Sequence, residues 1–446
     1  MNFPNETHIK IILVSFIVFS FFSCKKNNEE KIFEMSNDFI LRDEIDIEED
    51  ISSKKEKELK CAIDTYMKNL SLDERIAQLF AVGIDGNDIL HSYAKTEFKN
   101  GAPGSFLLFS ANIAQTAEQT ASFTNSVLSW FIEQNLVPPF FMIDNEGGDV
   151  YRFEEIGSKL LSPEKMTEYF LPDEAEQYYS LIALQMKAMN IHLNLAPIVE
   201  VKNEYNAAFL GRRSYGTMEN VEKYGAAFIK GLDSAGVGAT LKHFPGNTNA
   251  DPHLGLPHLK DSQEEIELLY IEPFRKLSVF GADAVLISHI VIDSIDEGVP
   301  VCFSPKIINE KLKESFWKNG LVISDDLYMG ALSKNGYPPE VAVVKALKAG
   351  IDILMISEKR FSKAAAAIKK EAQTDENFMS RINNAVRQIL LFKIKRNILK
   401  VLPLEENSDY TLVPAQIDSV EENMLIFKNA KTKADLLYAE QINKHR

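Results

Sequence analysis

The amino-acid sequence predicts an α/β protein whose core is a (β/α)8 barrel of the TIM type. One observation behind this prediction is that eight short apolar runs recur along the chain, most of them bounded by Gly, Pro or Asn. Another is that most of the gaps between the runs carry amphipathic helical patterns. Nearly continuous apolar strands that alternate with helices are typical of a parallel sheet buried on both faces. Eight such units in about 340 residues fit a closed barrel. The alternative is an open doubly wound sheet, but no Gly-rich phosphate loop follows the first run.

The segment before the barrel is predicted to be an export signal. Its apolar run over residues 11–22 is broken only by Ser15 and Ser20, which is short for a bilayer span and fits the h-region of a signal peptide. Ser23 and Cys24 follow, and a small residue before a cysteine at this place resembles a bacterial lipoprotein processing site. Cleavage would leave Cys24 as a lipidated N-terminus. A plain signal peptide and an uncleaved anchor are the alternatives, and all three versions export the chain. We therefore expect a signal peptide over residues 1–23 and an exported, membrane-anchored lipoprotein on the periplasmic or cell-surface side.

Three segments follow the signal. Residues 24–56 are rich in charged residues and Asn and poor in aromatics, so we expect a flexible tether. Residues 57–402 are expected to form the barrel. Its strands are expected at residues 79–84, 105–109, 140–143, 191–195, 239–241, 284–287, 321–323 and 351–355. Helices are expected near 57–69, 220–235, 263–279, 339–349 and 380–400, and another from Ser71, which has capping-box spacing to Glu74. Residues 403–446 are expected to be a C-terminal extension with a short helix at 432–441.

Net charge and cysteine content exclude two classes of protein. The chain carries 64 Asp and Glu against 49 Lys and Arg, a formal net charge of −15. An acidic surface repels phosphate backbones, so nucleic acid is not an expected partner. Only three cysteines are present, so no disulfide framework is implied.

Polar and titratable side chains gather where the apolar runs end. The ends in question carry Asp144, Asn194, Lys242 with His243, His289, and Asp325 with Asp326. In a (β/α)8 barrel the catalytic groups lie at the C-terminal ends of the strands. Taken singly, Asp325 could cap the next helix and His289 could be a hydrogen-bonded core histidine. Five such ends on one face of one barrel favour an active site.

Three of the candidate residues suggest a reaction. Asp251 and His253 lie two residues apart on a tight loop, where the carboxylate can orient the imidazole and stabilise its charged form. This pair could move a proton while Asp325 attacks a carbon atom. Glycoside hydrolysis with retention needs that combination of a nucleophile and a proton shuttle.

An ordered set of motifs resembles a known family. Residues 70–400 resemble the barrel domain of glycoside hydrolase family 3, in its β-N-acetylglucosaminidase branch. The motifs, in chain order, are Leu72-Asp73-Glu74-Arg75-Ile76-Ala77-Gln78, Ile143-Asp144-Asn145-Glu146-Gly147-Gly148 with Arg152, Asn194-Leu195-Ala196-Pro197, Gly211-Arg212-Arg213-Ser214-Tyr215, Lys242-His243-Phe244-Pro245-Gly246, Asp251-Pro252-His253, and Ser324-Asp325-Asp326-Leu327-Tyr328-Met329-Gly330-Ala331.

The resemblance implies a role for each site residue. Asp325 would be the nucleophile, and His253 would be the general acid/base supported by Asp251. The sugar hydroxyls would be held by Asp144, Arg152, Arg213, Lys242 and His243. These types suit the task, since carboxylates accept hydroxyl hydrogen bonds while Arg and Lys donate them. Positive charge beside Asp325 would keep its pKa low. No cofactor or metal is implied. The implied activity is that of a retaining exo-β-N-acetylglucosaminidase acting on peptidoglycan-type or chitin-type oligosaccharides.

The chain departs from the family pattern at several positions. Asn247-Thr248-Asn249 replaces the His-Gly that commonly follows the K-H-F-P-G motif, and the loop to Asp251 is about two residues shorter. Pro252 stands where the family pattern has a serine. Asp149 stands where it has an arginine, and Glu200 stands where it has an aspartate. We expect these changes to affect substrate detail and rate more than reaction type.

Other functions stay open on the sequence alone. A lipid-anchored protein could bind glycans on the same barrel without turnover, and a β-glycoside phosphorylase or β-glucosidase could use the same nucleophile. The two-domain β-glucosidases of the family take their acid/base from a second domain, and none is expected after about residue 400 here. A metal hydrolase using His243, Asp251, His253 and His258 is a further alternative, but these spacings match no standard zinc signature.

Overall fold

The computed structural model describes residues 54–250, 255–404 and 409–445. The chain divides into two compact units, Met1–Lys60 and Cys61–Arg446. Residues 54–69 are helical, and the barrel lies in the second unit. In the described part of the chain, no helix is both long and apolar enough to cross a membrane. The segment expected to be a signal peptide, with Cys24, and most of the expected tether lie outside the described residues.

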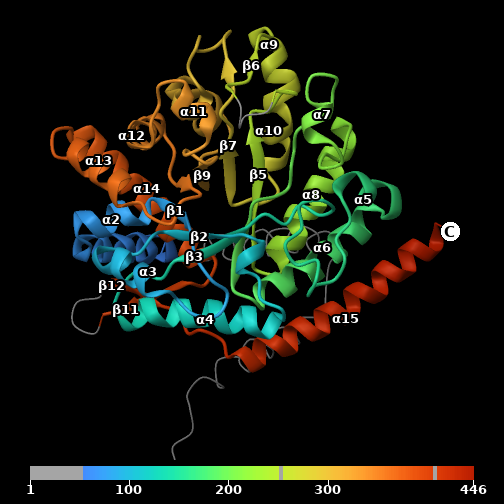
Figure 1. The fold of residues 1–446 in the computed structure, drawn as a ribbon, viewed down its shortest axis with the longest axis horizontal. Helices are drawn as coiled ribbons and strands as arrows, with labels where there is room; N and C mark the ends of the chain where they lie inside the picture. Colours follow the sequence, from blue (N-terminus) through green and yellow to red (C-terminus); the bar gives the residue numbers. More distant parts are fainter. Residues whose placement is uncertain (1–53, 251–254, 405–408, 446) are drawn as a thin grey trace, which may run out of the picture. The chain divides into compact units, whose positions relative to one another are not determined.

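Eight parallel strands form a nearly closed barrel (Figure 1). Their order around the sheet is β10-β1-β2-β3-β4-β5-β7-β9, and a single bridge between Ile323 and Ile353 joins the two ends. Each expected strand run overlaps one of these strands, so the predicted (β/α)8 architecture is confirmed. The strands are β1 (Phe80–Gly83), β2 (Ser105–Leu108), β3 (Phe140–Ile143), β4 (Ile191–Asn194), β5 (Gly238–Phe244), β7 (Ala284–Ile287), β9 (Leu321–Ser324) and β10 (Leu354–Ile356).

Helices surround the barrel. Their apolar faces pack on the outer side of the strands and so bury the apolar residues there. The expected capping box is present at the start of α2, where Ser71 Oγ accepts from Glu74 N at 3.2 Å and Ser71 N donates to Glu74 Oε2 at 2.8 Å. The α-helices are α2 (Leu72–Gln78), α3 (Ser92–Glu97), α4 (Ala117–Glu133), α5 (Pro163–Tyr169), α6 (Pro172–Lys187), α7 (Ala207–Leu210), α8 (Met218–Ser234), α9 (Gln263–Glu265), α10 (Glu272–Ser278), α11 (Gly330–Lys334), α12 (Pro339–Ala349), α13 (Ser362–Ala372), α14 (Glu376–Lys395) and α15 (Val420–Lys444).

Short elements complete the fold. The helix expected over 263–279 is one continuous run in which a π-helical segment, Ile266–Ile271, separates α9 from α10. A two-stranded parallel sheet, β6 (His258–Leu259) with β8 (Val291–Ile292), follows the loop that carries the expected dyad. The remaining segments are 3-10 turns at Phe98–Asn100, Ser110–Asn112 and Val301–Phe303 and a second π-helical segment at Lys306–Lys313.

The C-terminal region differs from its prediction. The closing helix α14 ends at Lys395, and an unpredicted antiparallel hairpin of β11 (Leu399–Pro403) and β12 (Tyr410–Pro414) follows. The prediction of a short helix over 432–441 is wrong in length, since α15 runs from Val420 to Lys444. Its start was missed although Ser419 and Glu422 form a capping box. The helix packs on α4 and α6 (Figure 1). Its buried apolar residues are Met424, Phe427, Ala430 and Ala434, which follow a helical spacing but are separated by charged residues.

Candidate active site

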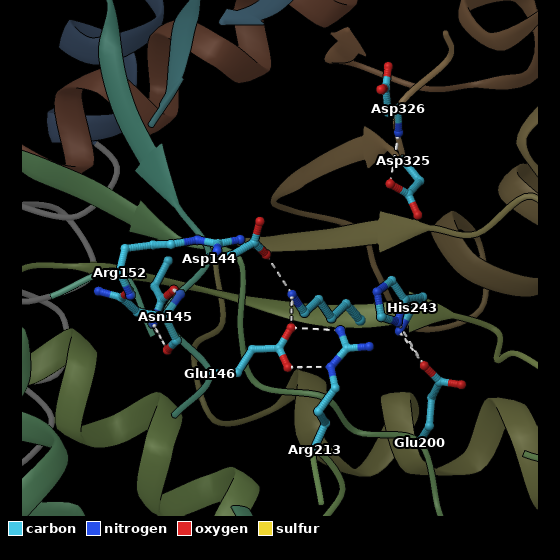
Figure 2. Close-up of polar contacts among 11 residues, drawn as sticks. Asp144, Asn145, Glu146, Arg152, Glu200, Arg213, His243, Asp325 and Asp326 are labelled. Carbon is cyan, nitrogen blue, oxygen red and sulfur yellow. Dashed lines mark hydrogen bonds and ion pairs between the residues drawn. The ribbon is translucent and has the colours of Figure 1, made fainter. Parts of the chain in front are cut away.

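A cavity of about 290 Å³ opens at the C-terminal ends of the barrel strands, where such folds place their catalytic groups. Six of the residues singled out in the sequence line it together. These are Asp144 after β3, Arg152 in the following loop, Arg213 after α7, Lys242 and His243 on β5, and Asp325 after β9. Figure 2 shows the labelled Asp144, Arg152, Arg213, His243 and Asp325 extending from these separate elements. The structure therefore brings together all the expected site residues that it describes.

Glu146 is the centre of a charged network that the sequence did not single out. Its carboxylate accepts two bonds from Arg213, from Nε at 2.7 Å and from Nη2 at 2.8 Å, in the bidentate geometry that guanidinium favours. Lys242 Nζ lies 2.6 Å from Glu146 Oε1 and 2.7 Å from Asp144 Oδ1 (Figure 2). The side chains of Lys242 and Glu146 are 3% and 1% exposed, so these charges depend on each other for compensation.

The network fixes the charge of its members. Burial alone would raise the pKa of the Glu146 carboxyl, but Lys242 and Arg213 outweigh it and lower that pKa from 4.5 to about 2. Burial alone would lower the pKa of Lys242, but Asp144 and Glu146 raise it above its ordinary value. Both groups are therefore charged at neutral pH. Asp144 keeps a side chain that is 25% exposed and lines the cavity, so it can meet a ligand there.

The depressed pKa of Glu146 gives a prediction about acid stability. The contribution of the ionised carboxylate is complete above pH 4.5 and is lost as the pH falls toward 2, because the unfolded chain is protonated first. The shift corresponds to about 3 kcal/mol of unfolding free energy. Between pH 4.5 and 2, the unfolding free energy of Glu146→Gln should therefore fall by about that amount less than the unfolding free energy of the wild type, as measured by urea denaturation. Glu219→Gln, at an exposed pair with Lys223, is the control and should leave the slope nearly unchanged. An equal slope in Glu146→Gln and wild type would contradict this electrostatic account.

Two glycines let the loop after β3 turn back into the cavity. Gly147 and Gly148 have φ values of 99° and 61°, a region that favours glycine. A Cβ on Gly147 would lie 2.1 Å from the carbonyl oxygen of Leu161, so no side chain fits. Asn145 holds the loop from inside, since its Oδ1 accepts from Arg152 N at 2.8 Å. This explains why Glu146 and Arg152 reach one cavity although they lie on opposite sides of the turn.

Asp325 and Asp326 follow β9 but have different surroundings. Asp326 Oδ1 accepts from the backbone N–H groups of Tyr328 and Ser357 at 3.0 and 3.1 Å, so this acid holds the turn. Asp325 lines the cavity, and its Oδ1 accepts from Asp326 N at 2.8 Å. Burial alone would raise the pKa of Asp325, but the nearby His289 and His243, the Asp326 N–H and Lys242 lower it below its ordinary value. Asp325 is therefore an ionised carboxylate that a ligand can reach.

Two histidines near Asp325 are held by neighbouring groups. His289 Nε2 lies 3.0 Å from the carbonyl oxygen of Asp326, to which it can donate. His243 Nδ1 lies 2.8 Å from Glu200 Oε1. The sequence marked Glu200 only as a departure from the family pattern, and its contact with His243 could not be read from residues that lie far apart in the chain.

The proton-shuttle pair Asp251 and His253 lies outside the described residues. The segment before it is fixed by Asn249, whose backbone N donates to Tyr205 O at 2.6 Å and whose Oδ1 accepts from Ala208 N at 2.8 Å. After it, His258 Nδ1 lies 2.9 Å from Asp293 Oδ2, between β6 and the turn after β8. Asn249, one of the residues by which the chain departs from the family pattern, therefore fixes the end of the described segment that precedes the expected pair.

A protein-family model described as the glycosyl hydrolase family 3 N-terminal domain matches residues 71–392. The β-hexosaminidase of Tolumonas auensis is 35% identical over 230 residues, which cover 50% of this chain and 67% of that protein. The β-hexosaminidase of Hydrogenovibrio crunogenus is 31% identical over 260 residues, covering 56% of this chain and 70% of that protein.

Solved structures resemble the barrel over most of its length. A glycoside hydrolase family 3 β-N-acetylglucosaminidase from a Paenibacillus species superimposes with a TM-score of 0.68 and 27% identity, over 81% of this chain and 68% of that chain. A β-N-acetylhexosaminidase from Beutenbergia cavernae superimposes with a TM-score of 0.64 and 24% identity, over 73% of this chain and 99% of that chain, a likeness that concerns the fold.

Proposed function

This chain belongs to glycosyl hydrolase family 3 and is a glycoside hydrolase, and on that premise we propose that it is a retaining exo-β-N-acetylglucosaminidase. Its substrate would be a glycan that ends in β-linked N-acetylglucosamine, such as a peptidoglycan fragment or a chitin-type oligosaccharide. The names of the relatives, β-hexosaminidases and a β-N-acetylglucosaminidase, support this choice. The single observation that carries the proposal is the ionised Asp325 beside a cavity lined by charged hydrogen-bonding groups.

The proposed reaction proceeds by double displacement. The Asp325 carboxylate attacks the anomeric carbon while His253, oriented by Asp251, donates a proton to the leaving oxygen. The bond to the aglycone breaks and a glycosyl ester on Asp325 forms. His253, now neutral, removes a proton from water, which attacks the anomeric carbon and releases the sugar with its original β configuration. The low pKa of Asp325 supports its role, because a nucleophile must be ionised to attack.

The remaining cavity residues would hold the terminal sugar. Asp144 would accept hydroxyl hydrogen bonds through its exposed edge, while Arg152, Arg213 and Lys242 would donate. Lys242 and Arg213 are already fixed by Glu146, so little conformational entropy is lost when a sugar binds. A cavity of about 290 Å³ is compatible with one sugar unit, which supports exo action.

Release of nitrophenol from its N-acetyl-β-glucosaminide and β-glucoside, compared side by side with the full chain, tests the proposal. We expect turnover of the N-acetylglucosaminide, with the β anomer of the free sugar appearing first by proton NMR. No release with ligand binding intact would instead indicate a glycan-binding protein. Preferred release from the glucoside would indicate a β-glucosidase. Formation of a sugar 1-phosphate when phosphate is added would indicate a phosphorylase.

We further propose that the chain is exported and lipid-anchored at Cys24, in a segment that lies outside the described residues. The apolar run that ends at Ser23 and Cys24 supports this. In a bacterial host, radiolabelled palmitate should enter the wild-type protein and should not enter Cys24→Ser. Labelling of both proteins, or of neither, would refute attachment at Cys24.

A further inference from the structure

Glu200 concentrates an unusual number of hydrogen bonds on one oxygen. Its Oε1 lies 2.8 Å from His243 Nδ1, accepts the backbone N–H of His243 at 3.2 Å and accepts Asn247 Nδ2 at 3.1 Å. The backbone of Glu200 is fixed as well, since its carbonyl accepts from Ser214 Oγ at 2.7 Å. Val199 N, beside it, donates to the carbonyl oxygen of Lys242 at 3.0 Å. The carboxylate is thus held on the side of the His243 ring that carries Nδ1 (Figure 2).

The other oxygen of this carboxylate has no such support. Glu200 has a side chain that is 2% exposed, and Oε2 is buried without a hydrogen-bond partner among the described residues. Burying a carboxylate with one oxygen unsatisfied costs free energy, and an apolar side chain would avoid that cost. A role in packing alone therefore does not explain why a hydrogen-bond acceptor stands here.

The geometry points to Glu200 as a positioning residue for catalysis. We propose that it accepts the Nδ1 proton of His243, which fixes the tautomer and the orientation of the ring and leaves Nε2 free to accept a hydrogen bond from a hydroxyl of the terminal sugar. His243 lines the same cavity as Asp325, and no described residue bonds to its Nε2. The role of the sugar hydroxyl rests on the proposed function, whereas the tautomer does not.

Asn247 belongs to the same arrangement. It is 4% exposed, and its amide donates to the oxygen that faces His243. Positions 200 and 247 both depart from the family pattern, and their side chains are in direct contact. The donor from Asn247 keeps Oε1 directed at the ring, so Glu200 and Asn247 act on His243 as one unit.

Steady-state kinetics of five variants tests the proposal, with the nitrophenyl N-acetylglucosaminide as substrate. Glu200→Ala should lower kcat/KM by about 10²-fold, because the ring loses its orientation. The kcat/KM of Glu200→Gln should stay within about threefold of wild type. The three donors select the amide oxygen for the position of Oε1, and the amide nitrogen then takes the position of Oε2, which has no partner among the described residues. In the His243→Ala background, Glu200→Ala should cause no further loss. Glu219→Gln is the matched surface control.

The outcomes separate positioning from a structural role. A loss that adds fully to that of His243→Ala, or a Glu200→Ala variant as active as Glu219→Gln, overturns the proposal. A wild-type enzyme without glycosidase activity would instead refute the proposed function. The ¹⁵N chemical shifts of the His243 ring report its tautomer directly, and the signals are assigned by their disappearance in His243→Ala. These shifts decide on the proposal if the wild type has no glycosidase activity, and also if Glu200→Ala does not fold. The neutral ring should carry its proton on Nδ1, and a proton on Nε2 overturns the proposal.

Discussion

Asp325→Asn should lower kcat by about 10⁴-fold or more, the scale seen when a nucleophile is removed from an active site that otherwise stays intact. The amide has nearly the same shape as the carboxylate but cannot form the glycosyl ester. Asp325 Oδ1 accepts from Asp326 N, and an amide oxygen can replace it there, so the fold should survive. Release of nitrophenol from the N-acetylglucosaminide measures the loss, and thermal unfolding by circular dichroism checks the fold.

Asp326→Asn is the matched control for this variant. Asp326 holds the turn through the N–H groups of Tyr328 and Ser357, and an amide oxygen can accept from both. It should therefore keep kcat within about tenfold of wild type. If Asp326→Asn loses activity and Asp325→Asn keeps it, the assignment of the nucleophile is wrong.

His253→Ala should show a loss that depends on the leaving group. With an alkyl or sugar aglycone, whose oxygen needs a proton, kcat/KM should fall by about 10²- to 10⁴-fold. With a dinitrophenyl aglycone, which leaves without a proton, most of the loss in the first step should disappear. Azide should then speed turnover of the variant, because it attacks the glycosyl ester without needing a base. Rates for a series of aglycones of graded acidity measure this dependence.

The slope of that series decides the role of His253. An equal loss for every aglycone, with no rescue by azide, would contradict a proton shuttle at this position. Asp251→Asn should show the same pattern to a smaller degree, since it leaves the imidazole in place but removes the charge that orients it.

The barrel could be predicted from the sequence because its strands are short, apolar and buried on both faces, so each stands out from the helical segments around it. The residues at the strand ends could be predicted for the same reason, and Asp144, Lys242, His243 and Asp325 line one cavity. The helix α15 was underestimated because its buried residues are interspersed with charged ones, so its apolar stripe is weak.

The partners of the site residues could not be predicted. Glu146 lies within a recognised motif, but only the structure shows that it joins Lys242 to Arg213. Glu200 is 43 residues from His243, and nothing in the local sequence indicates that their side chains meet. Such pairs depend on how strands and loops meet in three dimensions, which periodicity and composition do not encode.

Mass spectrometry of a trapped intermediate tests most directly whether Asp325 is the nucleophile of a retaining N-acetylglucosaminidase. The wild-type chain would be incubated with a fluorinated N-acetylglucosaminyl fluoride, whose ester forms faster than it hydrolyses, and then digested. We expect one added sugar residue on the peptide that contains Asp325, and no addition in Asp325→Asn. Addition to a different carboxylate, or turnover of the reagent without any covalent ester, would contradict the assignment of Asp325 as the nucleophile.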